Sequence, residues 1–280
     1  MEVVQMRRSV TLALTAGAFL ALAATLASGG SPYRARAAEG CGLQSLRGGY
    51  GFAFEGQVAP SAAAEFDLAG AGRILFDGHA GLSGREAAST NGAQETLTFT
   101  GTYTVQPDCS GTATIANSNG RTDHITFGLV EGGQEFNFRD TDPGVVLTGQ
   151  ASRQAVNHCN DRSLRGVFNV AASGSFFDAG AEVTDWSISG DIHFDGQGHE
   201  FGSVSGNFGG PFADTFTGTY QVNPDCTGST IGNFSTGSSD HLFIVLVEQG
   251  NEVKFISTDP GNVIAGNFDR MSNGDDSSQN

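Results

Sequence analysis

The sequence predicts an all-β protein that contains two tandem copies of an antiparallel up-and-down barrel, each with about eight strands. Three observations lead to this prediction: the chain repeats itself, apolar and polar residues alternate along it, and turn residues recur at short intervals. Past residue 37 no segment shows the apolar spacing of an amphipathic helix. The alternative is a pair of β-sandwiches built from the same strands.

The repeat relates the two halves of the chain closely. The segment GTYTVQPDCSG at Gly101–Gly111 returns as GTYQVNPDCTG at Gly218–Gly228. Three shorter motifs also occur twice: Ser-Leu-Arg-Gly before the first strand, Phe-Asp-Gly, and Thr-Asp-Pro-Gly. We expect residues that are kept in both copies to serve the fold that the copies share.

Alternation with a period of two identifies the strands. In residues 96–105, Leu97, Phe99, Tyr103 and Val105 share one face and five threonines occupy the other, as in a strand with one buried face. Asp-Gly, Pro-Asp and Asp-Pro-Gly sequences mark the turns between such segments. The strands expected in the first copy are 49–58, 64–76, 79–90, 95–106, 110–117, 122–131, 134–141 and 144–152.

Turn order supports the barrel and a pairing of the cysteines. Successive turns of a meander alternate between its two ends, so Cys41, before the first strand, and Cys109, after the fourth, lie at the same end. Four cysteines allow three pairings, and the repeat favours Cys41–Cys109 with Cys159–Cys226. In the chain-entropy account each bridge would contribute several kcal/mol.

The start of the chain resembles an export signal. Arg7 and Arg8 precede an apolar run, and Ala35-Arg-Ala37 has the small-residue pattern of a signal-peptidase site. Paired cysteines agree with a secreted or periplasmic protein, exported by the Sec or the twin-arginine route. The expected division is a signal peptide at 1–37, barrels at 38–153 and 159–270, a linker at 154–158 and a disordered tail at 271–280.

Charge excludes some partners. The formal net charge is −16 at pH 7, which disfavours nucleic acid and anionic membrane surfaces, because both attract basic residues. No apolar run after the signal segment is long enough to embed the chain in a membrane. A cation or a basic protein partner suits the acidity better.

The repeated motifs resemble a set of bacterial exported proteins of uncharacterised function that carry tandem β repeats. The strand count is also similar to small barrels of the lipocalin and allene-oxide-cyclase type. The lipocalin Gly-x-Trp signature is not matched by Gly48-Gly49-Tyr50, and no cyclase catalytic motif is present. The resemblance therefore implies a barrel architecture and assigns no reaction.

Acids and imidazoles gather at the end opposite the disulfides. Asp123-His124 and the Thr-Asp-Pro-Gly turn lie there, and both are repeated. Oxygen ligands of this kind suit Ca²⁺, and a carboxylate beside histidine can orient it for proton transfer. Turn capping by aspartate is the simpler interpretation. The metal hypothesis concerns Asp123, Asp142, Asp240 and Asp259.

The second copy differs from the first at a few positions. Asp214 stands on the apolar face where the first copy has Leu97, and Trp186 replaces Leu68. The residues proposed for ligand binding are Trp186, Asp214, His241 and His124. Phe243, Val245 and Val247 make the outer face of one strand apolar, which predicts contact with the first repeat or self-association.

These observations favour a binding module without a cofactor over an enzyme. We expect a small apolar ligand inside a barrel or a partner protein at the rim. The alternatives are a cyclase or isomerase of the allene-oxide-cyclase type and a structural or adhesive surface module. Hollow interiors would favour the first two hypotheses over the third.

Overall fold

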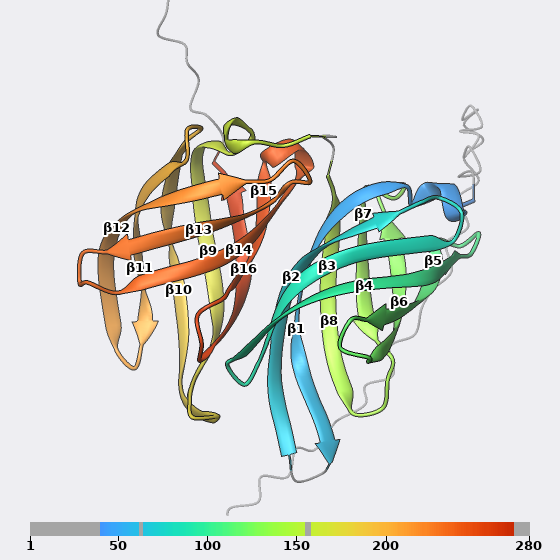
Figure 1. Ribbon diagram of the computed structural model, residues 1–280, viewed down its shortest axis with the longest axis horizontal. Helices are drawn as coiled ribbons and strands as arrows, with labels where there is room; N and C mark the ends of the chain where they lie inside the picture. The colour runs from blue at the N-terminus through green and yellow to red at the C-terminus, as the bar shows by residue number, and fades with distance from the viewer. Residues whose placement is uncertain (1–39, 62–63, 155–157, 272–280) are drawn as a thin grey trace, which may run out of the picture. The chain divides into compact units, whose positions relative to one another are not determined.

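Two closed antiparallel barrels form the fold, β1–β8 and β9–β16 (Figure 1). The computed structural model describes residues 40–61, 64–154 and 158–271. The predicted fold class is confirmed, and the sandwich alternative is wrong. The strands of the first barrel are β1 (Gly48–Ser61), β2 (Ala64–Phe76), β3 (Gly81–Thr90), β4 (Ala93–Val105), β5 (Ser110–Asn117), β6 (Thr122–Val130), β7 (Glu135–Asp140) and β8 (Val145–Arg153). Those of the second are β9 (Arg165–Asp178), β10 (Ala181–Asp195), β11 (His199–Phe208), β12 (Pro211–Val222), β13 (Thr227–Phe234), β14 (Ser239–Val247), β15 (Glu252–Ser257) and β16 (Asn262–Arg270).

Each strand pairs with the next, and the last strand of each barrel returns to the first. β8 closes on β1 from Tyr50 opposite Arg153 to Val58 opposite Val145. β16 closes on β9 in the same way. Closure leaves no strand edge unpaired. It also separates an inner face of large apolar side chains from an outer face of threonine, serine and charged side chains.

Aromatic side chains fill the closed end of each barrel, the end that carries the disulfide. In the first barrel Phe76 meets Tyr103 edge to face, with ring centroids 4.9 Å apart, and Tyr50 packs on both Phe76 and Phe136. The second barrel repeats this with Phe194 against Tyr220 at 5.1 Å. Such contacts add to the free energy gained by burying the rings themselves.

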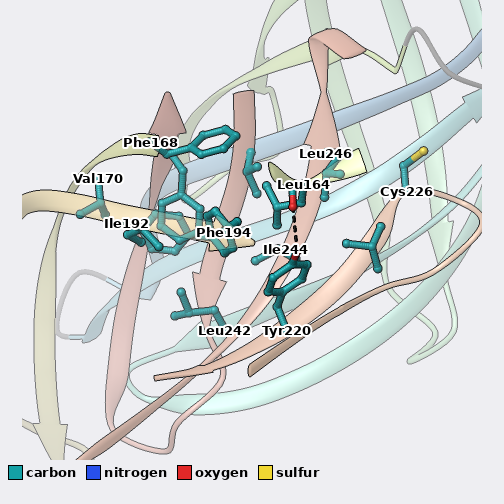
Figure 2. Packing of buried hydrophobic residues seen from close by; sticks show 14 of the residues in the cluster. Leu164, Phe168, Val170, Ile192, Phe194, Tyr220, Cys226, Leu242, Ile244 and Leu246 are labelled. Atoms are coloured by element: carbon teal, nitrogen blue, oxygen red, sulfur yellow. Dashed lines mark hydrogen bonds between the residues drawn. The ribbon is translucent and has the colours of Figure 1, made fainter. Parts of the chain in front are cut away.

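A short 3₁₀ turn covers the closed end of each barrel and is held by a buried tyrosine. The Tyr220 hydroxyl donates to the carbonyl of Leu164 at 2.7 Å and lies 3.1 Å from that of Asp161, beside the turn Asp161–Ser163 (Figure 2). Tyr103 makes the same two contacts with the turn Leu43–Ser45, which precedes β1. The Gly-Thr-Tyr motif is therefore kept in both copies because its tyrosine closes the barrel.

Disulfides tie the same turns to the sheet. Cys41 bonds to Cys109 and Cys159 bonds to Cys226, with sequence separations of 68 and 67 residues. The predicted pairing is confirmed.

The apolar outer face of β14 is buried within the chain. Val245 and Val247 are fully buried, and a Cβ added at Gly51 of β1 would lie 2.7 Å and 2.5 Å from their methyl carbons. Phe243 packs beside a cluster that joins Ala69 and Ala71 to residues of the second barrel. Val245 and Val247 therefore contact the first repeat, as one of the two expectations has it, and Phe243 is partly buried beside it.

An ion pair lies on the neighbouring strand β15. Lys254 Nζ donates to Glu252 Oε1 at 2.8 Å, and the lysine side chain is 1% exposed. The pair compensates two charges that burial would otherwise penalise.

The expected signal peptide, the middle of the expected linker and most of the expected tail lie outside the described residues. Among the helices of the described part, none has the length and apolar character needed to span a membrane.

Removal of one bridge should destabilise the fold substantially. Replacement of both Cys41 and Cys109 by alanine opens a loop of 68 residues and should lower the free energy of unfolding by about 4 kcal/mol. Urea unfolding followed by circular dichroism measures the change. A loss below about 1 kcal/mol would show that the loop is restrained in the unfolded chain by other means.

The tyrosine that closes the second barrel offers a smaller and more local test. Tyr220→Phe keeps the ring packing and removes the donor to the Leu164 and Asp161 carbonyls, so it should cost about 1–2 kcal/mol. Thermal unfolding monitors the loss, with Thr219→Ser, on the outer face of the same strand, as the control. Equal effects of the two substitutions would contradict a closing role for Tyr220.

Candidate functional site

The open end of the second barrel holds a cavity of about 550 Å³. Its walls come from the six consecutive strands β9 to β14 and from Asn262 of β16. The period of two along a strand brings alternate side chains to the same face. Phenyl and indole rings dominate the lining, together with Ile188 and Val204. The aromatic lining residues are Phe176, Trp186, Phe208, Phe212 and Phe234.

Trp186 contributes a polar N–H group to this aromatic lining. Its ring is half-buried on β10, and its Nε1 atom is shielded from solvent without a hydrogen-bond partner in the described part of the chain. A buried N–H without an acceptor costs free energy, so a polar ligand atom at this position would stabilise the complex. Trp186 was predicted to line a ligand site, and the structure places it on the wall of this cavity.

A narrower space continues from the cavity towards the closed end and contains Glu200. Trp186, Ile188 and Val204 line both spaces. The Glu200 side chain is 4% exposed, and a Cβ at Gly218 would lie 2.7 Å from its Oε1 atom. A Cβ at Gly218 would also meet the carbonyl oxygen of Ile231, as one at Gly101 would meet that of Thr114, so close strand pairing accounts for this glycine in both copies. In the second copy it also leaves room for the carboxyl group.

Burial controls the protonation of Glu200. Desolvation raises the pKa of this carboxyl to about 8, the hydroxyl of Thr230 partly opposes the rise, and the negative charge of Asp240 adds to it. Glu200 therefore carries a proton at neutral pH and can act as a hydrogen-bond donor.

Asp240 lies where the two spaces meet. Burial, and next the nearby charge of Asp259, raise the pKa of its carboxyl, while Ser257 Oγ donates to its Oδ1 atom at 3.2 Å. The second barrel therefore combines an aromatic wall with polar groups, among them Trp186, Glu200 and Asp240.

The first barrel also has an interior space at its open end, of about 90 Å³. Phenyl rings of β1, β4 and β7 line it, and Glu86 of β3 faces it. Desolvation is the main cause that raises the pKa of Glu86 to about 8, and the charges of Asp123 and Glu95 contribute.

The two interior acids occupy different positions of the same repeated strand. By the offset of the copies, Glu86 corresponds to Val204, and Glu200 corresponds to Leu82. Each barrel thus carries one acid at one of two inward positions that are four residues apart. The alternation along 82–88 and 200–206 is the sequence signal that places both acids on the inward face, although neither is among the predicted site residues.

The predicted histidines lie at the rim. The Nδ1 atom of His124 is 2.8 Å from Asp142 Oδ1, and that of His241 is 2.7 Å from Asp259 Oδ1. Both imidazoles are about half exposed, and neither lines the interior space of its barrel. The backbone N–H of His124 holds the pKa of Asp142 below its usual range, which is the behaviour of a turn-capping aspartate.

The structure brings the predicted calcium residues together in pairs, Asp123 with Asp142 and Asp240 with Asp259. Asp123, Asp140 and Asp142 can place one oxygen each within 4.8 Å of one another. Asp123 already accepts from Asn117 and Arg121. Ca²⁺ takes six to eight oxygen ligands, so calcium binding at Asp123 and Asp142, or at Asp240 and Asp259, stays a prediction from the sequence.

Asp214 lies at the start of β12, on the lining of the larger cavity. It occupies an inward-facing position of the strand, as expected, but its carboxylate accepts hydrogen bonds from the hydroxyls of Ser235 and Thr236 in the β13–β14 turn. These bonds lower its pKa to about 2. Asp214 therefore carries a charge at the mouth, where it braces a turn.

Comparisons with known proteins add little to this geometry. No family model matches the chain, and no curated protein is significantly similar in sequence. A crystal structure of a "putative AttH" from Nitrosomonas europaea is 7% identical, with a TM-score of 0.23, over 80% of this chain and 92% of that one. At this TM-score the likeness bears on neither the fold nor the function.

The raised pKa of Glu200 predicts a pH-dependent stability. The folded state holds a proton that the unfolded chain releases near pH 4.5, so this stabilisation is present at low pH and is lost as pH rises to about 8. Glu200→Gln should reduce the slope of unfolding free energy against pH in this interval by about 1.4 kcal/mol per pH unit. Urea titrations at several pH values test this.

Glu65→Gln provides the control, because Glu65 is exposed on β2. An unchanged slope in Glu200→Gln would show that Glu200 titrates in the folded state as it does in water.

Proposed function

We propose that the chain is an exported binding protein whose second barrel holds a small, largely apolar ligand. The observation that carries this proposal is the aromatic-lined cavity at the open end of that barrel, with the unpartnered N–H of Trp186 in its wall. Ligand sites are typically concave and mostly apolar, with few polar groups, and the volume of this cavity lies within their usual range.

The polar groups suggest the complementary chemistry of the ligand. Trp186 can only donate, and Glu200, while protonated, also has a hydrogen to donate. A carbonyl or ether oxygen on an otherwise apolar molecule would satisfy the indole N–H without a charge in the cavity. The ligand class we propose is therefore a neutral apolar molecule with a hydrogen-bond acceptor.

Binding accounts for the site better than catalysis does. The two imidazoles that supported a cyclase or isomerase are at the rim, outside the cavity linings, and each is held by an aspartate. Export rests on the sequence pattern of residues 1–37 and on the two disulfides, which are typical of oxidising compartments. An interior with free volume also fits a purely structural module poorly.

A fluorescent ligand tests the proposal directly, because Trp186 is the only tryptophan of the chain. N-phenyl-1-naphthylamine is neutral, apolar and able to accept excitation energy from tryptophan. Its emission should rise on excitation of Trp186, and the protein emission should fall in proportion. Because this probe offers no strong acceptor to the indole N–H and phenylalanine keeps an aromatic wall, Trp186→Phe should keep most of the binding and abolish the energy transfer.

Two phenylalanines of one strand form a matched pair of variants. Phe208 lines the cavity and is 50% exposed, whereas Phe201 is 53% exposed on the outer face, stacked on His193. Phe208→Ala should weaken probe binding about threefold to tenfold through lost contact area, and Phe201→Ala should leave it unchanged. Equal affinities in both variants, or no energy transfer in the unaltered protein, would refute the proposal.

A further inference from the structure

The interior space of the first barrel differs in character from the cavity of the second. At about 90 Å³ it has room for about six water-sized groups. Phenyl rings of Phe52, Phe54, Phe99 and Phe138 line it, and pairs of these rings lie with centroids about 6 Å apart. A ligand here must be small and must tolerate aromatic surroundings.

Glu86 is one of four acidic residues that line this space, with Glu95, Asp123 and Asp140. The other three each accept a hydrogen bond, whereas Glu86 accepts none from a described residue. A carboxylate in such a position is costly without a partner. The unfilled volume therefore lies next to the Glu86 carboxyl, which lacks a hydrogen-bond partner.

Charges around the opening favour a cation. Glu95 of β4, Asp123 of β6 and Asp140 of β7 also line the space, and Arg121 is the only basic residue of the lining. Arg121 is engaged with Asp123 at 3.3 Å and is half exposed. The carboxyl groups outnumber the guanidinium, so the potential at the opening attracts positive ligands.

We propose that the first barrel binds a short-chain primary ammonium ion, with its –NH₃⁺ group on the Glu86 carboxylate and its alkyl part among the phenyl rings. An ammonium group supplies the hydrogen-bond donors and the charge that Glu86 lacks, and aromatic faces attract cations. The volume limits the ligand to about six non-hydrogen atoms.

A metal ion suits the same space less well. Six to eight oxygen ligands surround Ca²⁺, whereas most residues that line the space are aromatic or aliphatic. The carboxylates of Glu95 and Asp140 already accept hydrogen bonds. Asp123 is occupied by Asn117 and Arg121. The lining therefore favours an organic cation.

Binding must release the proton that Glu86 carries. The ammonium ion keeps its three hydrogens, and the carboxyl proton leaves to solvent, so affinity depends on pH. Because the pKa of Glu86 is about 8, affinity should fall about tenfold for each pH unit well below 8 and become constant above it. The groups that face Glu86 and modulate this are Glu95, Arg121, Asp123 and Asp140.

Nuclear magnetic resonance of the full chain, labelled with ¹⁵N, can locate and quantify the site. Titration with n-butylamine at pH 8 should shift amide signals of β3 and of its neighbours β2 and β4, with saturation. 1-Butanol, of the same size and without charge, should bind at least tenfold more weakly. Affinity for the amine should decrease about fiftyfold between pH 8 and pH 6.

Two matched variants separate the site from general attraction to an acidic surface. Glu86→Gln keeps the shape and should weaken n-butylamine binding at least tenfold, whereas Glu65→Gln, at an exposed acid of β2, should leave it unchanged. Shifts that persist in Glu86→Gln, equal binding of amine and alcohol, or shifts with CaCl₂ and none with amine would each overturn the proposal.

The first-barrel site stands apart from the proposed function. The aryl-amine probe reports on Trp186 in the second barrel, so failure of either experiment leaves the other result intact.

Discussion

Closure of each eight-stranded sheet on itself is the constraint on which the structure depends. The pairing of β8 with β1, and of β16 with β9, fixes how wide each interior can be. An eight-stranded barrel is just wide enough for side chains to fill it or for one small ligand to occupy it. The sizes of a few inward residues therefore decide whether a given level of the barrel is solid or hollow.

Both copies divide the interior in the same way. The closed end is solid, because aromatic rings, a 3₁₀ turn and a disulfide converge there. The open end keeps free volume, and in each copy the third strand places one acid in or beside that volume. Glu86 and Glu200 use two inward positions of one repeated strand, so the copies share a scaffold and differ in the depth of their polar group.

Local sequence patterns predicted most of the scaffold. Alternation and turn residues located the strands to within three residues, and turn order led to the correct disulfides. These features depend on near neighbours and on the parity of turns. The interior sites were harder to foresee, because the free volume around a side chain depends on residues from many strands at once.

Asp214 and Glu200 illustrate this limit. Both occupy inward-facing positions of their strands, and only Asp214 stands out in the sequence, because it replaces a leucine of the first copy. At the strand start Asp214 turns to the hydroxyls of Ser235 and Thr236. Glu200 lies deeper, where Gly218 leaves space for it. The two residues differ in depth along the barrel axis. The alternation of a strand shows which face a residue lies on and does not show this depth.

The buried ion pair on β15 has a chemical consequence. Lys254 is the only lysine of the sequence, and its amine is enclosed beside Glu252. Acylating reagents and amine-directed cross-linkers need a free, exposed amine, so the folded barrels offer them no lysine. Acylation at Lys254 would therefore record transient exposure of β15, and the rest of the surface would contribute no background from lysine.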